Sequence, residues 1–419
     1  MKKIFCVMFS AIMLCIVCGC GNVETDYSSI VIYEDEEIIY NQSETTSLNS
    51  VESTVSSQDV AVNSNVTSSN QQSTDEPAVE NLENKFYLND TSTLQYIKTN
   101  GRCEKTDKGI NLNHAASAIE INTNSTSVLL EVETDTSLYY TIIIDDKITV
   151  QHQAVENSGI NYIVVARGLD STNHNIKFIR DSESRSNLKM TVLSIQLDDN
   201  KTLLTKDGNN KIIEFLGDSL TSGYGNMATN GVKNASNLEY LSATNAYPFL
   251  IANKLGLDYR IVSMSGIALG KREGYPTFEE FYNLESYNND TTKQYTSSNP
   301  QDVDIVVVNL GTNDASDKLY DEKNTESVKK YGKFFADLIT NVGYRKDVDV
   351  VFVSGVCWSH AQIPAYNVAV SELNARGYNN VYTIDIPTYN SGGGGHPSAD
   401  EHKQTADLII KFFKDNGIS

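Results

Sequence analysis

From about residue 201, short apolar runs alternate with longer segments of helical periodicity, and this alternation limits the fold more than any other feature. The apolar runs are residues 211–216, 258–263, 304–309, 349–354 and 381–384. The helical segments are residues 245–255, 325–342, 364–376 and 400–416. Strands that alternate with helices predict a parallel sheet covered by helices on both faces. The active site of such a domain is expected at the carboxyl ends of the strands.

Polar or glycine-containing motifs follow three of these runs. Gly217-Asp218-Ser219 ends the first run, Ser263-Met264-Ser265-Gly266 the second, and Asn309-Leu310-Gly311-Thr312-Asn313 the third. Because the carboxyl ends of parallel strands share one rim, Ser219, Gly266 and Asn313 are expected to converge there. Ser219 is therefore a candidate nucleophile, although Gly-Asp-Ser is also ordinary turn chemistry.

A serine nucleophile needs a general base within hydrogen-bonding reach. Of the six histidines, His114, His152 and His174 fall in the β-rich part of the chain before residue 201. Among the others, His396 is the best-placed candidate, and His396-Pro397-Ser398 opens the last helical segment. His360 follows a predicted strand and could line the site without being the base. His402 is expected on a solvated helix face.

Taken in order, these motifs resemble the four blocks of the SGNH (GDSL-type) hydrolases. The resemblance implies an esterase in which Ser219 attacks and His396 is the base. It also implies an oxyanion hole made by the backbone N–H groups of Ser219 and Gly266 and the side-chain amide of Asn313. We expect no metal or other cofactor, because no residue set has metal-ligand spacing and the serine mechanism needs no cation.

One position departs from the common pattern of that family. Most SGNH hydrolases carry an aspartate three residues before the histidine, where this sequence has Gly393. A backbone carbonyl can orient the histidine instead, by accepting a hydrogen bond from Nδ1–H. We therefore expect a Ser-His dyad. The alternative is a triad with a displaced acid, for which Asp385 and Asp400 are the candidates.

The N-terminal residues predict export and a lipid anchor. Residues 1–19 have a basic start at Lys2 and Lys3 and an apolar stretch, and the segment 17–20 resembles a bacterial lipoprotein cleavage site that places lipid on Cys20. An ordinary secretory peptide is the alternative. Residues 20–84 are rich in Ser, Thr and Asn and predict a disordered acidic linker. The protein is therefore expected on the outer face of the cell membrane, attached only through its lipid.

Residues 85–200 have a different sequence pattern from the rest of the chain. Short β-forming runs are separated by turn sequences, such as residues 145–147 and 168–171, without a convincing helical period. This pattern predicts an antiparallel β sandwich of the jelly-roll type, followed by the hydrolase domain at 201–419. The sandwich could support its neighbour or bind carbohydrate.

A β sandwich followed by an SGNH domain with such a dyad resembles the family 2 carbohydrate esterases. The resemblance runs from about Phe86 to the C-terminus and includes Gly101-Arg102 and the glycine-rich approach to His396. It implies removal of acetyl groups from plant polysaccharides such as xylan or glucomannan. It also implies an aromatic residue that holds the sugar, for which Trp358, the only tryptophan, is the candidate. A core or rim position for Trp358 is the alternative.

The formal net charge of -21 argues against nucleic acid as a partner, because phosphate backbones are bound by clustered Lys and Arg. An acetylated polysaccharide or oligosaccharide fits better. Two other functions remain open. One is an SGNH esterase or lipase that acts on cell-wall polymers or lipid esters, and the other is a carbohydrate-binding protein that has lost catalysis.

Overall fold

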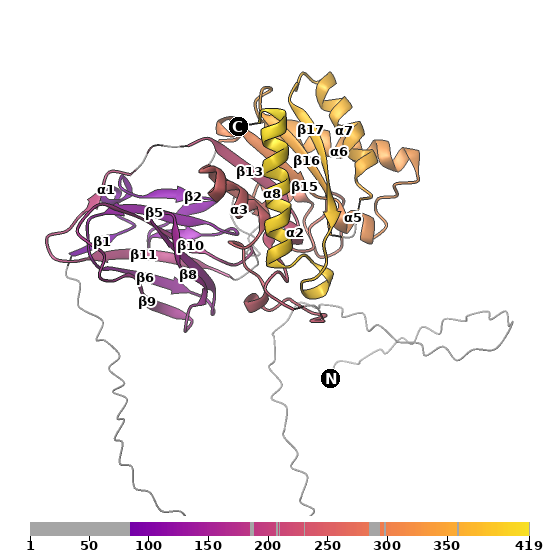
Figure 1. Ribbon diagram of the computed structural model, residues 1–419. Helices are drawn as coiled ribbons and strands as arrows, with labels where there is room; N and C mark the ends of the chain where they lie inside the picture. The colour runs from indigo at the N-terminus through magenta and orange to yellow at the C-terminus, as the bar shows by residue number, and fades with distance from the viewer. Residues whose placement is uncertain are drawn as a thin grey trace, which may run out of the picture. The chain divides into compact units, whose positions relative to one another are not determined.

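The computed structural model describes residues 84–184, 188–206, 208, 210–229, 231–284, 294–296, 299–357 and 360–418. All of them belong to one unit, Asp75–Ser419. Figure 1 shows their helices and strands as a coloured ribbon. The predicted signal segment, the linker as far as residue 83, Cys20 and Trp358 lie outside the described residues.

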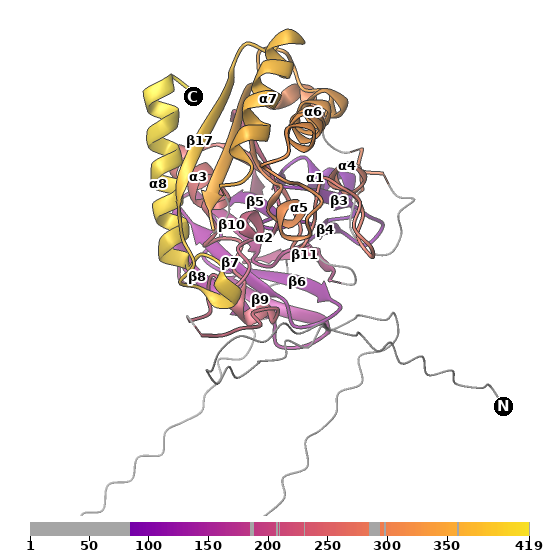
Figure 2. The same ribbon diagram turned by 90° about the vertical axis from the view of Figure 1, so that its right-hand side faces the viewer.

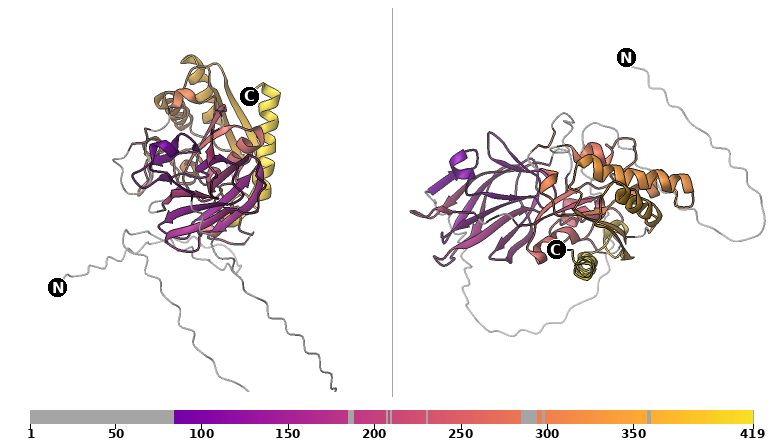
Figure 3. Two further views of the ribbon diagram at one scale, coloured as in Figure 1. Left: turned by 90° about the vertical axis from the view of Figure 1, so that its left-hand side faces the viewer. Right: turned by 90° about the horizontal axis from the view of Figure 1, so that it is seen from above.

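Residues 84–206, called the β domain below, form two antiparallel sheets (Figure 3). Buried side chains from both sheets make up one hydrophobic core. The first sheet has the order β3-β4-β11-β6-β9, with β1 also paired to β11, and the second has the order β12-β5-β10-β7-β8, with β2 paired to β5. The first sheet contains β1 (Asn84–Tyr87), β3 (Cys103–Lys105), β4 (Ile110–Leu112), β6 (Val128–Thr134), β9 (Gly159–Ala166) and β11 (Met190–Leu197). The second contains β2 (Lys98–Asn100), β5 (Ala118–Thr123), β7 (Tyr139–Ile144), β8 (Lys147–Ala154), β10 (His174–Arg180) and β12 (Leu203–Leu204). The predicted antiparallel architecture is confirmed, while its assignment to the jelly-roll type stays a prediction.

The rest of the described chain, called the α/β domain, is built on a parallel sheet with the order β14-β13-β15-β16-β17. Its strands are β13 (Ile212–Gly217), β14 (Asp258–Ser263), β15 (Ile305–Asn309), β16 (Asp349–Val356) and β17 (Val381–Thr388). The larger helices are α3 (Tyr247–Leu255), α6 (Thr325–Val342), α7 (Ile363–Ala375) and α8 (Ala399–Asn416). The predicted parallel sheet is confirmed. The largest difference between a predicted and an observed strand is at β17, which continues past the predicted end to Thr388.

Helices cover both faces of this sheet, as Figure 2 shows. On β15, Ile305 and Val307 belong to the core cluster that contains α3 and α8, whereas Val306 and Val308 belong to the cluster that contains α6 and α7. Successive strand residues point to opposite faces, so a strand buried on both sides must be apolar throughout. This requirement explains why the sequence reads here as uninterrupted apolar runs. Among the described residues, no helix combines the length and apolarity that a membrane span requires.

A buried ion pair joins the two domains at β13. The guanidinium of Arg102, from the β domain, lies 3.8 Å from the Glu214 carboxylate, donates a hydrogen bond to the Tyr282 carbonyl and stacks 4.3 Å from the Tyr282 ring. Glu214 also accepts a hydrogen bond of 2.6 Å from the Tyr344 hydroxyl. A charge is buried at acceptable cost only when such partners compensate it, so these groups fix β13 against the β domain.

Candidate active site

Ser219 lies where β13, an inner strand of the parallel sheet, gives way to the short helix α2 (Ser219–Ser222). A Cβ at Gly217 would lie 1.8 Å from the Thr221 hydroxyl, so only glycine allows this tight turn. The Asp218 carboxylate caps the turn by accepting a 3.0 Å hydrogen bond from the Leu220 N–H, and burial raises the pKa of Asp218 to about 7. The strand and its turn therefore leave Ser219 partly exposed at the carboxyl edge of the sheet.

His396 contacts Ser219 directly. Its Nε2 lies 2.9 Å from the Ser219 hydroxyl oxygen, and its Nδ1 lies 3.2 Å from the carbonyl oxygen of Gly394. A carbonyl can only accept, so this pairing favours the tautomer with the proton on Nδ1 and a free electron pair on Nε2. Burial lowers the pKa of His396 below its usual value, although the Gly394 hydrogen bond opposes the shift. The ring is therefore neutral at pH 7 and can accept the Ser219 proton.

The glycine-rich turn that carries His396 has no room for a side chain at Gly393. A Cβ there would lie 2.6 Å from the Ala235 Cβ and 2.7 Å from the Ala228 Cβ. The Gly393 N–H donates to the Gly225 carbonyl at 2.9 Å, and Gly394 has a φ of 62°, which favours glycine. The position where most SGNH hydrolases carry an aspartate is therefore packed too closely here to hold a side chain.

The two aspartates considered as displaced acids lie elsewhere. Asp385 is on β17, where its carboxylate lies 2.6 Å from both the Ser354 hydroxyl and Nδ1 of His360. Asp400 is in the first turn of α8. Within the described part of the chain, the hydrogen-bond acceptor at Nδ1 of His396 is the Gly394 carbonyl, not a carboxylate.

Of the two remaining predicted residues, Gly266 lies in the loop after β14, and Asn313 lies in the short helix α5 (Thr312–Ser316) after β15. The Asn313 side-chain amide donates to the Ile267 carbonyl at 2.8 Å and lies 3.4 Å from the Asp218 carboxylate. Gly266 has a φ of 83°, and a Cβ there would lie 3.0 Å from the Tyr275 ring. Asn313 thus bridges the loop that contains Gly266 and the turn that contains Ser219.

The structure corrects the expectation for His402. This residue is fully buried rather than solvated, because α8 packs against α3, and its Nδ1 lies 3.3 Å from the Tyr247 N–H. Burial lowers the pKa of His402 to about 3. His360 lies at the rim of the sheet, where its Nε2 is 3.0 Å from the Thr388 hydroxyl, and it is not hydrogen-bonded to Ser219 within the described residues.

Other residues around the site carried no signal in the sequence. The Tyr224 ring centre lies 4.7 Å from that of His396, and the buried Cys357 thiol lies 3.1 Å from the Gly395 carbonyl oxygen. The buried carboxylate of Glu183, from the β domain, accepts a hydrogen bond from the Ser265 N–H. A tyrosine or cysteine outside a recognised motif could not be assigned to the site from spacing alone.

Comparisons with known proteins match both domains. Residues 99–206 match the family model described as carbohydrate esterase 2 N-terminal, and residues 215–408 match the GDSL-like lipase/acylhydrolase family. An acetylxylan esterase / glucomannan deacetylase of Cellvibrio japonicus is 25% identical over 299 residues, which cover 68% of this chain and 79% of that protein. The cellulase/esterase CelE of Acetivibrio thermocellus is 22% identical over 338 residues, which cover 76% of this chain but only 39% of CelE.

Solved structures share the fold. An acetyl xylan esterase from the rumen bacterium Butyrivibrio proteoclasticus superposes with a TM-score of 0.69 at 17% identity, covering 79% of this chain and 98% of that one. A family two carbohydrate esterase from Clostridium thermocellum, solved with cellohexaose, has a TM-score of 0.65 at 21% identity and covers 76% and 98% of the two chains. The two matched domains show a carbohydrate esterase 2 N-terminal domain followed by a GDSL-type (SGNH) hydrolase domain, so the chain is a carboxylic ester hydrolase with the domain arrangement of carbohydrate esterase family 2.

Proposed function

We propose that this protein is a membrane-tethered, extracellular esterase that removes O-acetyl groups from plant polysaccharides such as xylan or glucomannan, and that Ser219 and His396 form its catalytic dyad. The observation that carries the proposal is the 2.9 Å contact between the Ser219 hydroxyl and Nε2 of His396. The acetylxylan esterase / glucomannan deacetylase relative supports the choice of substrate.

In the first half of the reaction, the Ser219 oxygen attacks the acetyl carbonyl carbon while Nε2 of His396 takes the hydroxyl proton. The resulting imidazolium donates from Nδ1 to the Gly394 carbonyl, whose dipole stabilises the positive charge. The bond between the acetyl carbon and the sugar oxygen then breaks, and Nε2 returns its proton to that oxygen. The products are the free sugar hydroxyl and acetyl-Ser219.

Water completes the cycle by the same route in the second half. His396 removes a proton from water, the resulting oxygen attacks acetyl-Ser219, and acetate leaves as Ser219 recovers its proton. In both halves, negative charge develops on the carbonyl oxygen. Preorganised donors stabilise such charge, and the backbone N–H groups of Ser219 and Gly266 with the Asn313 amide are the donors we assign.

The first prediction tests the dyad and the substrate together. The wild-type protein should release acetate from acetylated xylan or glucomannan. Ser219→Ala and His396→Ala should each lower kcat by about a thousandfold or more, and the double variant should lose little beyond the worse single one, because the two residues act as a unit. Asn313→Ala should lower kcat by about a hundredfold, as loss of one oxyanion donor does. Acetate release is the measurement.

Acetylated peptidoglycan and a long-chain ester serve as comparison substrates in that assay. A preference for either would replace the polysaccharide proposal with a cell-wall esterase or a lipase. Full activity of Ser219→Ala would contradict the serine mechanism. A wild-type protein that binds polysaccharide but hydrolyses none of these esters would instead be a binding protein that has lost catalysis.

The second prediction concerns Gly393. Gly393→Asp should not create a better triad, because its side chain would clash with Ala228 and Ala235 and displace the turn that holds His396. Overpacking of this kind costs about 1–3 kcal/mol of stability, and a displaced base lowers kcat, here by about tenfold or more. Thermal unfolding and kcat measure the two effects.

A matched variant separates packing from chemistry. Adding Ala228→Gly and Ala235→Gly to Gly393→Asp should restore part of the lost stability, because it removes both clashing methyl groups. Gly393→Asp alone with kcat above the wild-type value would contradict this account. A loss of about a hundredfold in Asp385→Ala or Asp400→Ala, with the fold intact, would indicate a displaced triad acid instead.

The third prediction concerns the lipid anchor, which we propose from the sequence. An acidic protein gains little from anionic headgroups, so acyl chains on Cys20 would supply its membrane affinity. Cys20→Ala should therefore move active enzyme from the membrane fraction to the medium, without changing kcat. Fractionation followed by an esterase assay measures this, and an unchanged membrane fraction would argue against lipidation.

A further inference from the structure

A short segment of the β domain contacts loops that border the proposed catalytic site. Residues 181–184 follow β10 directly, and all four side chains are buried, with at most 2% of each residue exposed. The segment includes two carboxylates, Asp181 and Glu183. Buried carboxylates are costly unless hydrogen bonds satisfy them, so their partners show what the segment holds in place.

Glu183 contacts the loop that contains the oxyanion donor. Its Oε2 accepts a 3.1 Å hydrogen bond from the Ser265 N–H and a second hydrogen bond from the Ser265 hydroxyl. Ser265 precedes Gly266, so the peptide that joins them contains the Gly266 N–H. The backbone of Glu183 is held in turn, because the buried Arg180 guanidinium donates to its carbonyl at 2.6 Å.

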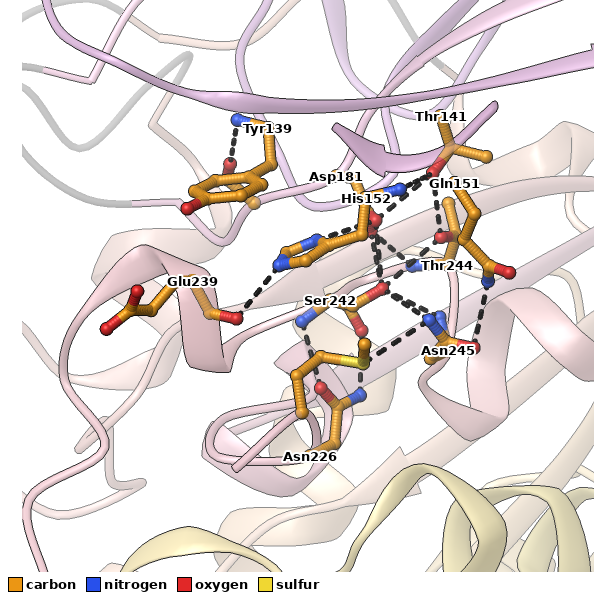
Figure 4. A network of polar contacts seen from close by, with 12 residues as sticks. Tyr139, Thr141, Gln151, His152, Asp181, Asn226, Glu239, Ser242, Thr244 and Asn245 are labelled. Carbon is orange, nitrogen blue, oxygen red and sulfur yellow. Dashed lines mark hydrogen bonds and ion pairs between the residues drawn. The ribbon is translucent and has the colours of Figure 1, made fainter. Parts of the chain in front are cut away.

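Asp181 contacts a different loop of the α/β domain (Figure 4). It accepts hydrogen bonds of 2.7 Å from the Thr244 N–H and 2.9 Å from the Ser242 hydroxyl, and it lies 3.0 Å from Nδ1 of His152. The other ring nitrogen of His152 lies 3.0 Å from the Glu239 carbonyl oxygen. Asp181 and His152 together hold the loop between residues 239 and 244 against the β domain.

That loop connects to the turn that carries His396. The Asn226 side chain accepts from the Ser242 N–H at 2.9 Å and donates to the Ser242 carbonyl at 2.8 Å. The adjacent Gly225 carbonyl accepts a 2.9 Å hydrogen bond from the Gly393 N–H. Hydrogen bonds therefore link Asp181 to Ser242 and Ser242 to Asn226. Asn226 is bonded covalently to Gly225, which is hydrogen-bonded to the glycine-rich turn.

We propose that Asp181 and Glu183 are positioning residues, which hold the His396 turn and the Gly266 loop, respectively, in register with Ser219. The inference rests on the proposed function, because it assigns these loops to catalysis. It makes the β domain part of the active site rather than a separate support. Small displacements of reacting groups cost much of the rate, so the loss of either carboxylate should lower kcat more than it weakens substrate binding.

The test compares Glu183→Ala and Asp181→Ala with the conservative variants Glu183→Gln and Asp181→Asn. On a soluble aryl acetate, each alanine variant should lower kcat by about tenfold or more while KM changes little, because no substrate contact is removed. Glu183→Gln should stay within about threefold of wild type, because its amide oxygen can still accept from Ser265. Asp181→Asn should likewise lose less than Asp181→Ala.

Asp198→Ala is the matched control. Asp198 is a β-domain carboxylate that accepts hydrogen bonds from Ser125, Thr126 and Ser127, all within its own domain. Its loss should lower the melting temperature without changing kcat. If the alanine variants at 181 and 183 fold but keep wild-type kcat, the inference is overturned. If they do not fold, Ser265→Ala is the alternative variant, because it removes the hydroxyl that donates to Glu183 and leaves Glu183 unchanged. This variant should still lower kcat, and an unchanged kcat would count against the proposal.

Hydrogen exchange distinguishes this inference from the proposed function. Amides in residues 264–268 should exchange faster in Glu183→Ala, and amides in residues 391–396 should exchange faster in Asp181→Ala, whereas Asp198→Ala should affect neither segment. This readout needs no catalysis. A wild-type protein that is inert on every acetyl ester would contradict the esterase proposal. The amide exchange rates would still show whether Asp181 and Glu183 hold the two loops in place. Unchanged exchange in both segments would refute those roles.

Discussion

The hydrogen bond between Nδ1 of His396 and the Gly394 carbonyl is the interaction on which the proposed site depends. In the proposed dyad, this bond takes the orienting role that a carboxylate has in a triad, because it favours the tautomer in which Nε2 can accept from Ser219. The bond requires a turn in which Gly393 packs against two alanine methyl groups and Gly394 has a positive φ. The missing aspartate is therefore one consequence of how this turn is packed.

The turn itself depends on residues outside the α/β domain. Its neighbouring loop is held by Asp181, and the Gly266 loop is held by Glu183, both from the β domain. Burying a carboxylate without hydrogen-bond donors costs free energy. The donors of the α/β domain offset this cost for Asp181 and Glu183 only when the two domains meet in this register. Arg102 and Glu214 impose the same condition at β13. The two domains thus form one functional unit in this account.

Some of this arrangement was predictable from the sequence. The strand predicted at residues 258–263 coincides with β14, because a strand buried on both faces leaves an unbroken apolar run. Ser219, Gly266 and Asn313 could be placed at one rim because strand ends converge. The burial of His402 was not predictable, since it depends on how α8 packs on α3. The role of Glu183 depends on a contact between residues 82 positions apart, which no local pattern encodes.

The most direct test of the account is the tautomer of His396, measured by ¹⁵N NMR on histidine-labelled protein, with the ring signals assigned by comparison with His396→Ala. We predict a neutral ring at pH 7 with the proton on Nδ1 and none on Nε2, unchanged in Asp385→Asn and Asp400→Asn. A proton on Nε2, or an Nδ1 signal that shifts when either aspartate is replaced, would contradict orientation by the Gly394 carbonyl.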